Sequence, residues 1–524
     1  MHLLQELSRA FLYTKDYLTT CIFIDTNDSP PMKSLLILVF GCITLQGSAQ
    51  NDSLALVAFY QAMNGPNWTT PWDLHQPMSA WYGVDLLDKR VYGISLISNN
   101  LKGELPNAIL DLTEMRNFQV GNDSISGTIP DSIQRMKNLQ FFYCTKTQLS
   151  GSIPAAFGDL ESITNLYLSF NELTGELPPS LANWKNLLDF DVSNNQLTGS
   201  IPDGFGENST LRTFNISANH FNGAIPEDLK DAKNLEELIL FRNELTDFPP
   251  DLMANMNKLR RAQWSENDFS GALPVLPANI ESFSCVDNHF SGAIPPSTKD
   301  LTHLTTLDIR ENDFSEIPDF HGHPSLVFLD IGGNAFTFED VLPNIGTAEF
   351  YTYSDMKTVG QDTVIDVPYG SDFIHRFSID TSIANKTFHF YKGQVNWMSN
   401  STGLLEFPDF SVLDTGTYQV EITHPDAPDL ILRSYHLRLT TEVTTARPHS
   451  DTTSPVIIYP NPVQNVLHLQ GTDATEKIII TNMLGQLVVR PAPAPKEGIA
   501  VSNLSPGVYF LHLQDRPAIR FIKL

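Results

Sequence analysis

The residues of this chain that could carry catalysis are few and poorly grouped. Asp189 and Asp191 form a carboxylate pair, but the surrounding sequence predicts an exposed strand face without a cleft that would raise the pKa of either group. His321 and His323 are the closest histidine pair, and zinc would need a third or fourth ligand beside them. The phosphate-loop, H-E-x-x-H and G-x-S-x-G motifs are missing from the sequence. We therefore expect no enzyme activity, no metal site and no cofactor, with both residue pairs solvated.

Aromatic side chains suit a different chemistry, the recognition of protein or sugar surfaces. Large amphipathic rings supply much of the binding energy at such surfaces. Two groups of residues are candidates for ligand binding. The first is Phe141, Tyr143, Tyr167 and Phe170, and the second is Ile239, Phe241, Arg242 and Arg261. Scattered exposed apolar residues also occur on surfaces without a function, and this alternative stays open for each group.

Both groups lie in a segment that repeats one short pattern. The pattern L-x-L-x-x-N-x-L-x-G-x-I-P recurs eleven times between residues 99 and 334, and eight copies keep a period of 24 residues. Its two leucines alternate with polar residues before the Asn, which predicts a short strand with one buried face. Stacked copies would pair these strands into a parallel sheet, so the repeat predicts a solenoid. Side chains two and four residues before the Asn are expected to point outward from the concave sheet.

The Asn of the pattern, here called the ladder position, is expected to hold the stack together. Its amide can pair with backbone groups that would otherwise be unpaired inside the solenoid, where each unpaired group costs roughly 1–3 kcal/mol. Asp123 cannot donate a hydrogen bond when ionised and Thr147 is short, so we expect these two positions to be the weakest. The ladder residues are Asn99, Asp123, Thr147, Asn171, Asn195, Asn219, Asn243, Asn267, Asn288, Asn312 and Asn334.

The L-x-G-x-I-P part of the repeat resembles the plant-specific class of leucine-rich repeats found in receptor-kinase ectodomains. The resemblance extends to residues 51–91, where Leu54–Tyr60 is expected to form a capping helix opened by Asp52 or Ser53. Plant caps carry a cysteine pair near the tryptophan that this chain has as Trp68, and the pair is missing here, which favours a bacterial version. The resemblance implies a right-handed solenoid with a parallel sheet on its concave face and short 3-10 or irregular segments on its convex face.

Two segments after the repeats alternate with a period of two, which is typical of antiparallel β-sandwiches. In the first, Asp414-Thr-Gly-Thr-Tyr418 resembles the tyrosine corner of immunoglobulin-like domains, with Phe390 in place of the core tryptophan. A spacer that binds no ligand is the alternative for this segment. In the second, Tyr459-Pro-Asn-Pro-Val463 and Leu504-Ser-Pro-Gly-Val-Tyr-Phe510 resemble the C-terminal sorting domain of type IX secretion cargo. This resemblance implies that residues 456–524 engage the type IX secretion machinery.

The amino terminus and the charge bear on localisation. Met32-Lys33 followed by the apolar run Ser34–Gly41 has the order of a signal peptide, which would make residues 1–31 an upstream extension. No other stretch is apolar and long enough to span a bilayer. With 33 basic and 60 acidic residues the net charge is −27, which disfavours nucleic acid as a partner. We expect a protein that is secreted or attached to the outer cell surface after signal-peptide removal.

The fold class is expected to be mixed, a leucine-rich-repeat solenoid followed by two small antiparallel β-sandwich domains. The expected order is an upstream extension (1–31), a signal peptide (32–49), a capping helix region (50–92), a solenoid of about 11 repeats (93–345), an immunoglobulin-like sandwich (346–440), a linker (441–455) and a sorting domain (456–524). The function hypothesis is a non-catalytic recognition protein that binds an extracellular protein or glycan through the concave face of the solenoid. The alternative is a structural adhesin or matrix stalk with no single defined ligand.

Overall fold

The computed structural model describes residues 49–377, 379, 383–441, 456–472, 476–482, 486–493, 497–513 and 518–524. Contacts divide the chain into two compact units. The first runs to Phe269 and adds Pro274–Phe283, and the second combines Ser270–Leu273 with Ser284–Leu524. The expected upstream extension, the signal peptide up to residue 48 and residues 442–455 of the expected linker lie outside the described residues. Within the described part, no helix has the length and apolar character needed to cross a membrane.

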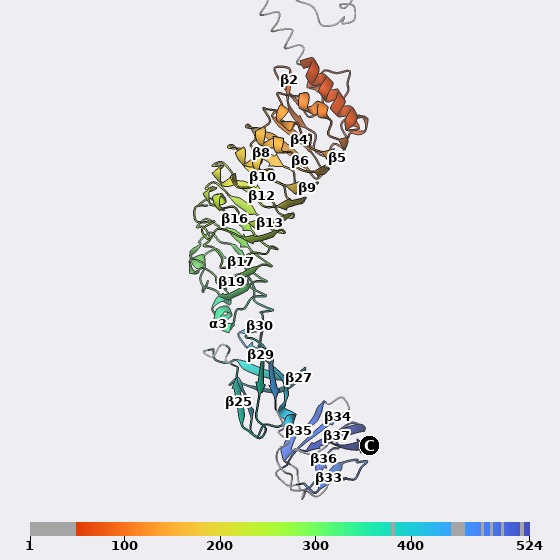
Figure 1. Ribbon diagram of the computed structural model, residues 1–524, viewed down its shortest axis with the longest axis vertical. Coiled ribbons are helices and arrows are strands. Elements are labelled where there is room, and N and C mark those ends of the chain that lie inside the picture. Colours follow the sequence, from red (N-terminus) through yellow and green to blue (C-terminus); the bar gives the residue numbers. More distant parts are fainter. Residues whose placement is uncertain are drawn as a thin grey trace, which may run out of the picture. The chain divides into compact units, whose positions relative to one another are not determined.

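The first unit begins with a helix that is fixed to the first strands by a buried ion pair. Residues 49–62 are helical (Figure 1), so Asp52 and Ser53 lie inside the helix and neither opens it, contrary to the expectation. Asp52 is fully buried and accepts hydrogen bonds from Arg90 Nε at 2.8 Å, Arg90 Nη2 at 3.0 Å and Val91 N at 2.9 Å. Arg90 and Val91 begin strand β2 (Arg90–Ser95), which pairs antiparallel with β1 (Val84–Leu87). The carboxylate therefore serves to anchor the helix and is not a helix cap.

Aromatic rings fill the space beside this helix. Tyr60, Trp68, Trp72 and Trp81 form a chain of ring contacts in which neighbouring centroids lie 5.0 Å apart. All four side chains are buried. Because burying large rings removes much apolar surface from water, this cluster can close the end of the core without the cysteine pair of the plant caps.

Each repeat contributes one short strand to a long parallel sheet. After β2 the strands of the first unit follow in the order β4 (Asn117–Gly121), β6 (Phe141–Thr145), β8 (Asn165–Tyr167), β10 (Asp189–Asp191), β12 (Thr213–Asn215), β14 (Glu237–Ile239) and β16 (Arg261–Gln263), as Figure 1 shows. The register advances by one repeat at each step, so that Phe190 pairs with Leu166 on one side and with Phe214 on the other. β18 (Ser282–Ser284) follows in the chain, and in the second unit β20 (Thr306–Asp308), β22 (Phe328–Asp330) and β23 (Phe350–Thr352) pair in parallel. The predicted leucine-rich-repeat solenoid is confirmed.

A second parallel sheet, which the sequence analysis did not predict, follows the ladder positions. In the first unit it contains β3 (Lys102–Glu104), β5 (Ser124–Thr128), β7 (Gln148–Gly151), β9 (Glu172–Glu176), β11 (Gln196–Gly199), β13 (His220–Ala224) and β15 (Glu244–Asp247). The second unit has β17 (Ser270–Gly271), β19 (His289–Ala293) and β21 (Asp313–Glu316). Short 3-10 turns lead back to the long sheet, at Asn107–Asp111 (η4), Ile133–Arg135 (η5), Ala155–Asp159 (η6), Pro179–Asn183 (η7), Phe205–Glu207 (η8), Glu227–Asp231 (η9) and Pro296–Asp300 (η10).

The ladder amides connect each repeat to the one before it. Asn219 is buried, and its Nδ2 donates to Val192 O of the preceding repeat and to Ile216 O, both at 3.0 Å, and to Ser217 O at 3.2 Å. Its Oδ1 accepts from Leu197 N at 2.9 Å. Bonds of the same kind, to the residue's own turn and to the preceding repeat, are made by Asn171, Asn195, Asn243, Asn267, Asn312 and Asn334.

The first ladder positions depart from this arrangement. Asn99 Oδ1 accepts from Thr70 N at 2.8 Å, but its Nδ2 is buried without a partner among the described residues. Asp123 only accepts, from Leu101 N at 3.1 Å and Asn99 N at 3.4 Å, and burial raises the pKa of its carboxyl. Thr147 donates through its hydroxyl to Asn171 Oδ1. Fewer bonds therefore connect the first repeats than connect those around Asn219.

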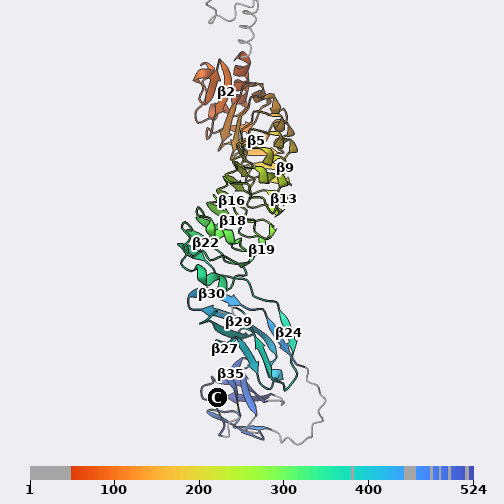
Figure 2. The ribbon, with the colours of Figure 1, turned by 90° about the vertical axis from the view of Figure 1, so that its left-hand side faces the viewer.

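The second unit also contains two small, mainly antiparallel β-sheet domains, seen from the side in Figure 2. The first has the strand order β24 (Thr363–Asp366), β31 (Leu437–Thr440), β29 (Gly416–His424), β26 (Thr387–Lys392) and β27 (Val395–Asn400), with β30 (Ala427–Arg433) on β29, and a second sheet of β25 (Phe373–Arg376) and β28 (Leu404–Phe407). The other has β35 (Leu487–Pro493), β34 (Lys477–Asn482), β37 (Gly507–Leu513) and β38 (Ile519–Lys523), and a sheet of β32 (Ile457–Tyr459), β33 (Val466–Gln470) and β36 (Ile499–Ala500).

One tyrosine in each of these domains makes the same backbone contact. Tyr418 Oη donates to Asp414 O at 2.7 Å, and Tyr509 Oη donates to Ser505 O at 2.8 Å, in both cases four residues earlier. Both side chains are buried in a sandwich core. The hydroxyl thereby satisfies a carbonyl at the turn that leads into the strand.

Candidate functional site

Successive side chains along each strand of the long sheet point alternately into the core and outward, and only the outward ones can contact a ligand. In β6, Phe142 and Cys144 are fully buried, whereas Phe141 and Tyr143 are only half-buried. In β8, Leu166 is buried and Tyr167 is half-buried. Phe141, Tyr143 and Tyr167 therefore share the exposed face of the long sheet, which is the face expected to be concave. We call these three residues the aromatic patch.

The three rings of the aromatic patch are in mutual contact. The ring centroids of Phe141 and Tyr143 lie 6.4 Å apart with an angle of 12° between their planes. Tyr167 lies 5.5 Å from Phe141 and 5.8 Å from Tyr143, tilted against both. On the neighbouring strand, a Cβ at Gly121 would lie 3.0 Å from Cε1 of Tyr143, so an edge of the tyrosine ring lies close to the glycine. The register of the sheet thus assembles one continuous aromatic surface from two repeats.

Phe170 does not join this surface. It precedes ladder residue Asn171 and has a left-handed backbone with φ of 57°. Its side chain is 49% exposed, and Lys146 Nζ lies 5.5 Å from its ring centroid. Among the described residues no ring contact links Phe170 to the aromatic patch. Phe170 lies on the turn after β8 and not on the strand itself.

The left-handed turn is common to all the repeats. Every residue that precedes a ladder position has positive φ, from 52° at Lys146 to 66° at Gly333. Non-glycine residues seldom adopt this conformation, and Asn and Asp tolerate it best. Most of these positions hold other residue types, so the sequence carried little signal for the turn.

A fixed carboxylate lies beside the aromatic patch. Asp189 of β10 accepts from Tyr167 Oη at 3.0 Å and from Asn165 Nδ2 at 2.5 Å, both through its Oδ2. Burial and the negative charge of Asp189 raise the pKa of Tyr167 to about 12. Asp191 Oδ1 accepts from Ser193 N at 3.0 Å. The two carboxylates, expected to be simply solvated, are instead held in place by neighbouring groups.

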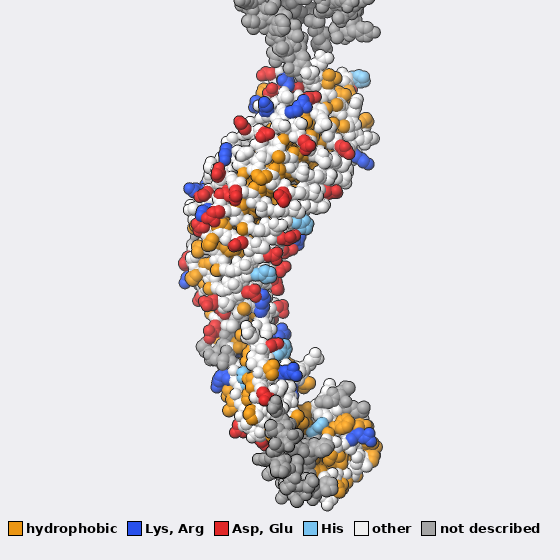
Figure 3. Space-filling view, viewed as in Figure 1, with side chains coloured by type: hydrophobic (Ala, Val, Ile, Leu, Met, Phe, Trp, Pro, Cys, Tyr) orange, Lys and Arg blue, Asp and Glu red, His pale blue; other side chains and the backbone are white. Residues whose placement is uncertain are grey.

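The outward strand positions around the patch hold acidic but no basic side chains. The residues two, four and six positions before ladder residues Asp123 to Asn219 include Asp189 and Asp191 and no Lys or Arg. Figure 3 shows hydrophobic side chains in a band along the visible face of the first unit, with acidic side chains spread beside it. This charge disfavours an anionic ligand at the aromatic patch.

The second candidate group is less available for binding. Ile239 is only 9% exposed, and Phe241 is half-buried. Arg242 lies on the left-handed turn before Asn243, and its Nε is 2.8 Å from Glu266 Oε2. Arg261 Nη1 lies 3.4 Å from Glu237 Oε1. Both guanidinium groups already have carboxylate partners one repeat away, which reduces their capacity to bind an additional anion.

A further acidic pair, which the sequence analysis missed, lies on the same sheet in the second unit. Asp308 and Asp330 are register partners on β20 and β22, and Arg310 Nη1 lies 3.4 Å from Asp330 Oδ2. Burial raises the pKa of Asp308 to about 6, the charge of Asp330 adds to this shift, and Arg310 opposes it. Asp308 Oδ1 is buried and accepts no hydrogen bond from the described residues. The sequence feature that could have revealed this pair is an aspartate four positions before each of two successive ladder residues.

The charge of Asp308 should destabilise the fold at neutral pH. The folded protein holds the Asp308 proton up to about pH 6, whereas the unfolded chain releases it near 3.8, so stability falls as the pH rises through this window. We expect Asp308→Asn to raise the free energy of unfolding by roughly 2 kcal/mol at pH 7 and to have no such effect at pH 4. Urea unfolding at both pH values measures this, with exposed Asp300→Asn as the control. An equal gain at both pH values would contradict the assignment.

The remaining candidate residues, a histidine and two cysteines, lie in surroundings that indicate a structural role. His323 is not solvated as expected, because its Nδ1 accepts from Leu326 N at 3.1 Å and burial lowers its pKa. Within the described part of the chain, no cluster of three potential metal ligands occurs. Cys144 and Cys285 are free and buried. Neither of these two cysteines forms a disulfide.

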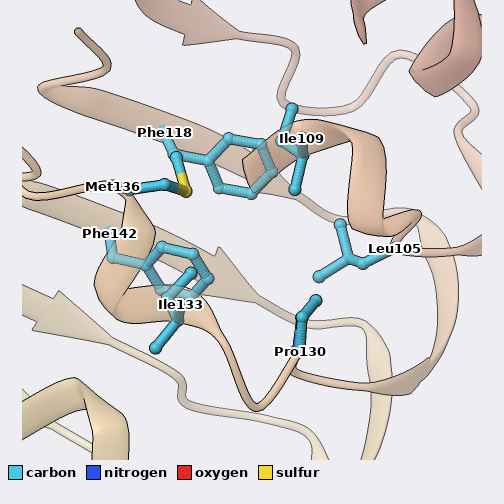
Figure 4. A pocket seen from close by; sticks show the side chains of 7 residues that line it. All are labelled: Leu105, Ile109, Phe118, Pro130, Ile133, Met136 and Phe142. Carbon is cyan, nitrogen blue, oxygen red and sulfur yellow. The ribbon is translucent and has the colours of Figure 1, made fainter. Parts of the chain in front are cut away.

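One small void lies in the core between η4 and η5 (Figure 4). Its volume is about 10 Å³, and its lining is apolar. A space of this size holds at most one water molecule, which would find no polar partner there. The lining residues are Leu105, Ile109, Phe118, Pro130, Ile133, Met136 and Phe142. The void is therefore a packing defect and offers no room for a ligand.

Comparison with known proteins supports the identity of two parts of the chain. Residues 457–523 match the family model of a secretion system C-terminal sorting domain. Residues 162–184 and 186–208 match the leucine-rich repeat model. The sorting domain indicates type IX secretion and a location outside the cell or on its outer surface. Both kinds of domain are typically non-catalytic.

The relatives that were found are plant proteins. Leucine-rich repeat protein FLOR 1 of Arabidopsis thaliana is 31% identical over 112 residues, which cover 20% of this chain and 34% of that protein. Receptor-like kinase TMK4 of the same plant is 28% identical over 116 residues, which cover 22% of this chain and 12% of that protein. This chain therefore spans only a minor part of the length of either relative.

Solved structures with a similar fold include two plant receptor complexes. The plant peptide hormone receptor RGFR1 in complex with RGF2 is 31% identical, with a TM-score of 0.47, over 51% of this chain and 44% of that chain. The PEPR1-AtPEP1 complex is 24% identical, with a TM-score of 0.50, over 59% of this chain and 49% of that chain. The chain therefore contains leucine-rich repeats and a C-terminal sorting domain, and structures with a similar fold include plant receptors.

Proposed function

We propose that this protein is a secreted or surface-attached recognition protein that binds an extracellular ligand through the exposed face of its long sheet. The observation that carries the proposal is the aromatic patch. Three half-buried rings from two repeats meet on this face, and a carboxylate is fixed beside them. Contiguous aromatic surface with a few oriented polar groups is typical of binding sites and is costly to leave in water.

The other parts of the chain support this role by placing the repeats outside the cell. Residues 456–524 engage the type IX secretion machinery, and residues 346–440 form an immunoglobulin-like spacer whose tyrosine corner is made by Tyr418. The ligand-binding residues are Phe141, Tyr143 and Tyr167. Of the other candidates, Phe170 lies on the turn before Asn171, Arg242 and Arg261 are paired with carboxylates, and Ile239 and Phe241 lie three repeats further along the solenoid.

Replacing Tyr143 and Tyr167 with alanine should weaken ligand binding and change the melting temperature little. Both rings lie on the surface of the sheet, so their removal leaves the buried core intact. The measurement is binding to an array that carries neutral and acidic oligosaccharides together with basic and acidic peptides. Tyr82→Ala is the matched control, because Tyr82 is 52% exposed and lies outside the long-sheet face.

The same measurement distinguishes the proposed function from the alternative role. A structural adhesin or stalk without a defined ligand would give no saturable signal on the array, and the double variant would behave like the wild type. Saturable binding that survives in the double variant would remove the aromatic patch from the proposal.

A further inference from the structure

We infer that the aromatic patch is a binding platform for a neutral oligosaccharide. The inference rests on the proposed function and adds the chemical class of the ligand. It depends on the shape of the rings, on the acceptors beside them and on the charge of the surrounding face.

The rings present faces of the kind that pyranose rings pack against. A Cβ at Gly121 would lie 3.0 Å from Cε1 of Tyr143, so the absence of a side chain there leaves room for this ring. Phe141 has nearly the same plane as Tyr143, at an angle of 12°. The C–H groups on one face of a sugar are apolar and weakly positive, and the face of an aromatic ring carries the complementary negative quadrupole. Adjacent rings with similar planes therefore offer stacking positions for successive sugar residues.

Acceptors for hydroxyl groups lie at the edge of these rings. Asp189 has its Oδ2 occupied by Tyr167 Oη and Asn165 Nδ2, which fix the direction of the carboxylate. Its Oδ1 takes no hydrogen bond from the described residues and can accept one from a ligand. Asn165 lies on β8, between β6 and β10, and is the register partner of both Phe141 and Asp189. A hydroxyl beside a stacked sugar would thus meet a charge-assisted acceptor of fixed orientation.

The charge of the face selects among ligands. With Asp189 and Asp191 and no basic residue at the neighbouring outward positions, an acidic polysaccharide or a nucleic acid would be repelled. A basic peptide is the competing ligand, because a cation can also lie over an aromatic ring. Two neutral donors already occupy Asp189 Oδ2, however, and the three rings form a surface wider than one ammonium or guanidinium group covers. These features favour a polyhydroxylated ligand.

Titration calorimetry of the purified full chain tests the inference. The probes are neutral gluco-, manno- and xylo-oligosaccharides of increasing length, polygalacturonate and oligolysine. We expect one neutral series to bind with affinity that rises with chain length, and neither charged polymer to bind at the patch. Tyr143→Ala should weaken that binding about tenfold or more, and Tyr143→Phe should retain it, because stacking uses the ring and not the hydroxyl.

A second variant tests the acceptor separately. Asp189→Asn keeps the shape of the side chain but loses the charge, and we expect it to reduce the affinity for the sugar about tenfold with an unchanged melting temperature. Binding of oligolysine that Tyr143→Ala abolishes would overturn the sugar assignment and leave the proposed function standing. Sugar binding that Tyr143→Ala does not affect would overturn both. If no neutral series binds at millimolar concentration, the sugar assignment is overturned, and the peptide arm of the array still decides the proposed function.

Discussion

Arg90→Ala is expected to lower the free energy of unfolding by about 3–5 kcal/mol, because it leaves a buried carboxylate without its cation. Asp52 is fully buried in the first helix, and the guanidinium of Arg90 holds both of its oxygens, at 2.8 and 3.0 Å. This pairing is also the main cause that raises the pKa of Arg90. Without it, Val91 N would be the only hydrogen-bond donor to Asp52 among the described residues. Urea unfolding followed by tryptophan fluorescence reports on this end directly, since Trp68, Trp72 and Trp81 lie in the same cap.

Two further variants separate the charge effect from packing. Arg90→Lys restores a cation but only one point of contact, so it should recover part of the loss. The double variant Asp52→Leu/Arg90→Leu should be less destabilised than Arg90→Ala, because it leaves no unpaired charge inside the protein. A loss below about 1 kcal/mol in Arg90→Ala would show that water reaches Asp52 and that the ion pair does not anchor the helix.

Asn219→Ala is expected to cost about 3 kcal/mol, because one side chain serves four backbone groups. Its removal leaves the carbonyls of Val192, Ile216 and Ser217 without this donor, and the N–H of Leu197 without this acceptor. The individual costs do not simply add, since the groups share one site and can relax together. Thermal and urea unfolding measure the loss.

Asn222→Ala is the matched control for this ladder variant. Asn222 lies three residues further on, in β13, with an exposed side chain. Its removal should change stability by no more than about 0.5 kcal/mol. Equal effects of the two substitutions would mean that the ladder amide contributes no more than a surface asparagine does.

The long sheet could be predicted because its signal repeats in the sequence. Buried residues such as Leu166, Phe190 and Phe214 recur every 24 residues and become register partners in the sheet. The second sheet could not be predicted in the same way, because strands such as β11 (Gln196–Gly199) bury a single side chain among polar ones. The start of the first helix was misplaced for another reason. Asp52 has the residue type of a helix cap, and only the tertiary partner Arg90 explains its position.

The candidate site was predictable in part for the same reason. Tyr143 and Tyr167 occupy equivalent positions in adjacent repeats, and Phe141 lies two residues before Tyr143 on the same strand, so the repeat period and the alternation along the strand bring the three rings together. Phe170 and Arg242 belong to the left-handed turn, whose backbone is determined by the ladder and not by the residue that occupies it. The pairing of Arg242 with Glu266 and of Arg261 with Glu237 was visible in principle, because the residues of each pair are 24 positions apart.

Site-specific photo-crosslinking in cells that secrete the protein tests the central claim most directly. A photoreactive phenylalanine replaces Gln119, the register partner of Tyr143 on the exposed face of the long sheet, or Thr198 on the second sheet as the control. We expect a saturable adduct at position 119 and none at position 198, and we expect excess wild-type protein, but not the Tyr143→Ala/Tyr167→Ala variant, to suppress the adduct. Adducts of equal yield at both positions, or none at position 119, would contradict a ligand on this face.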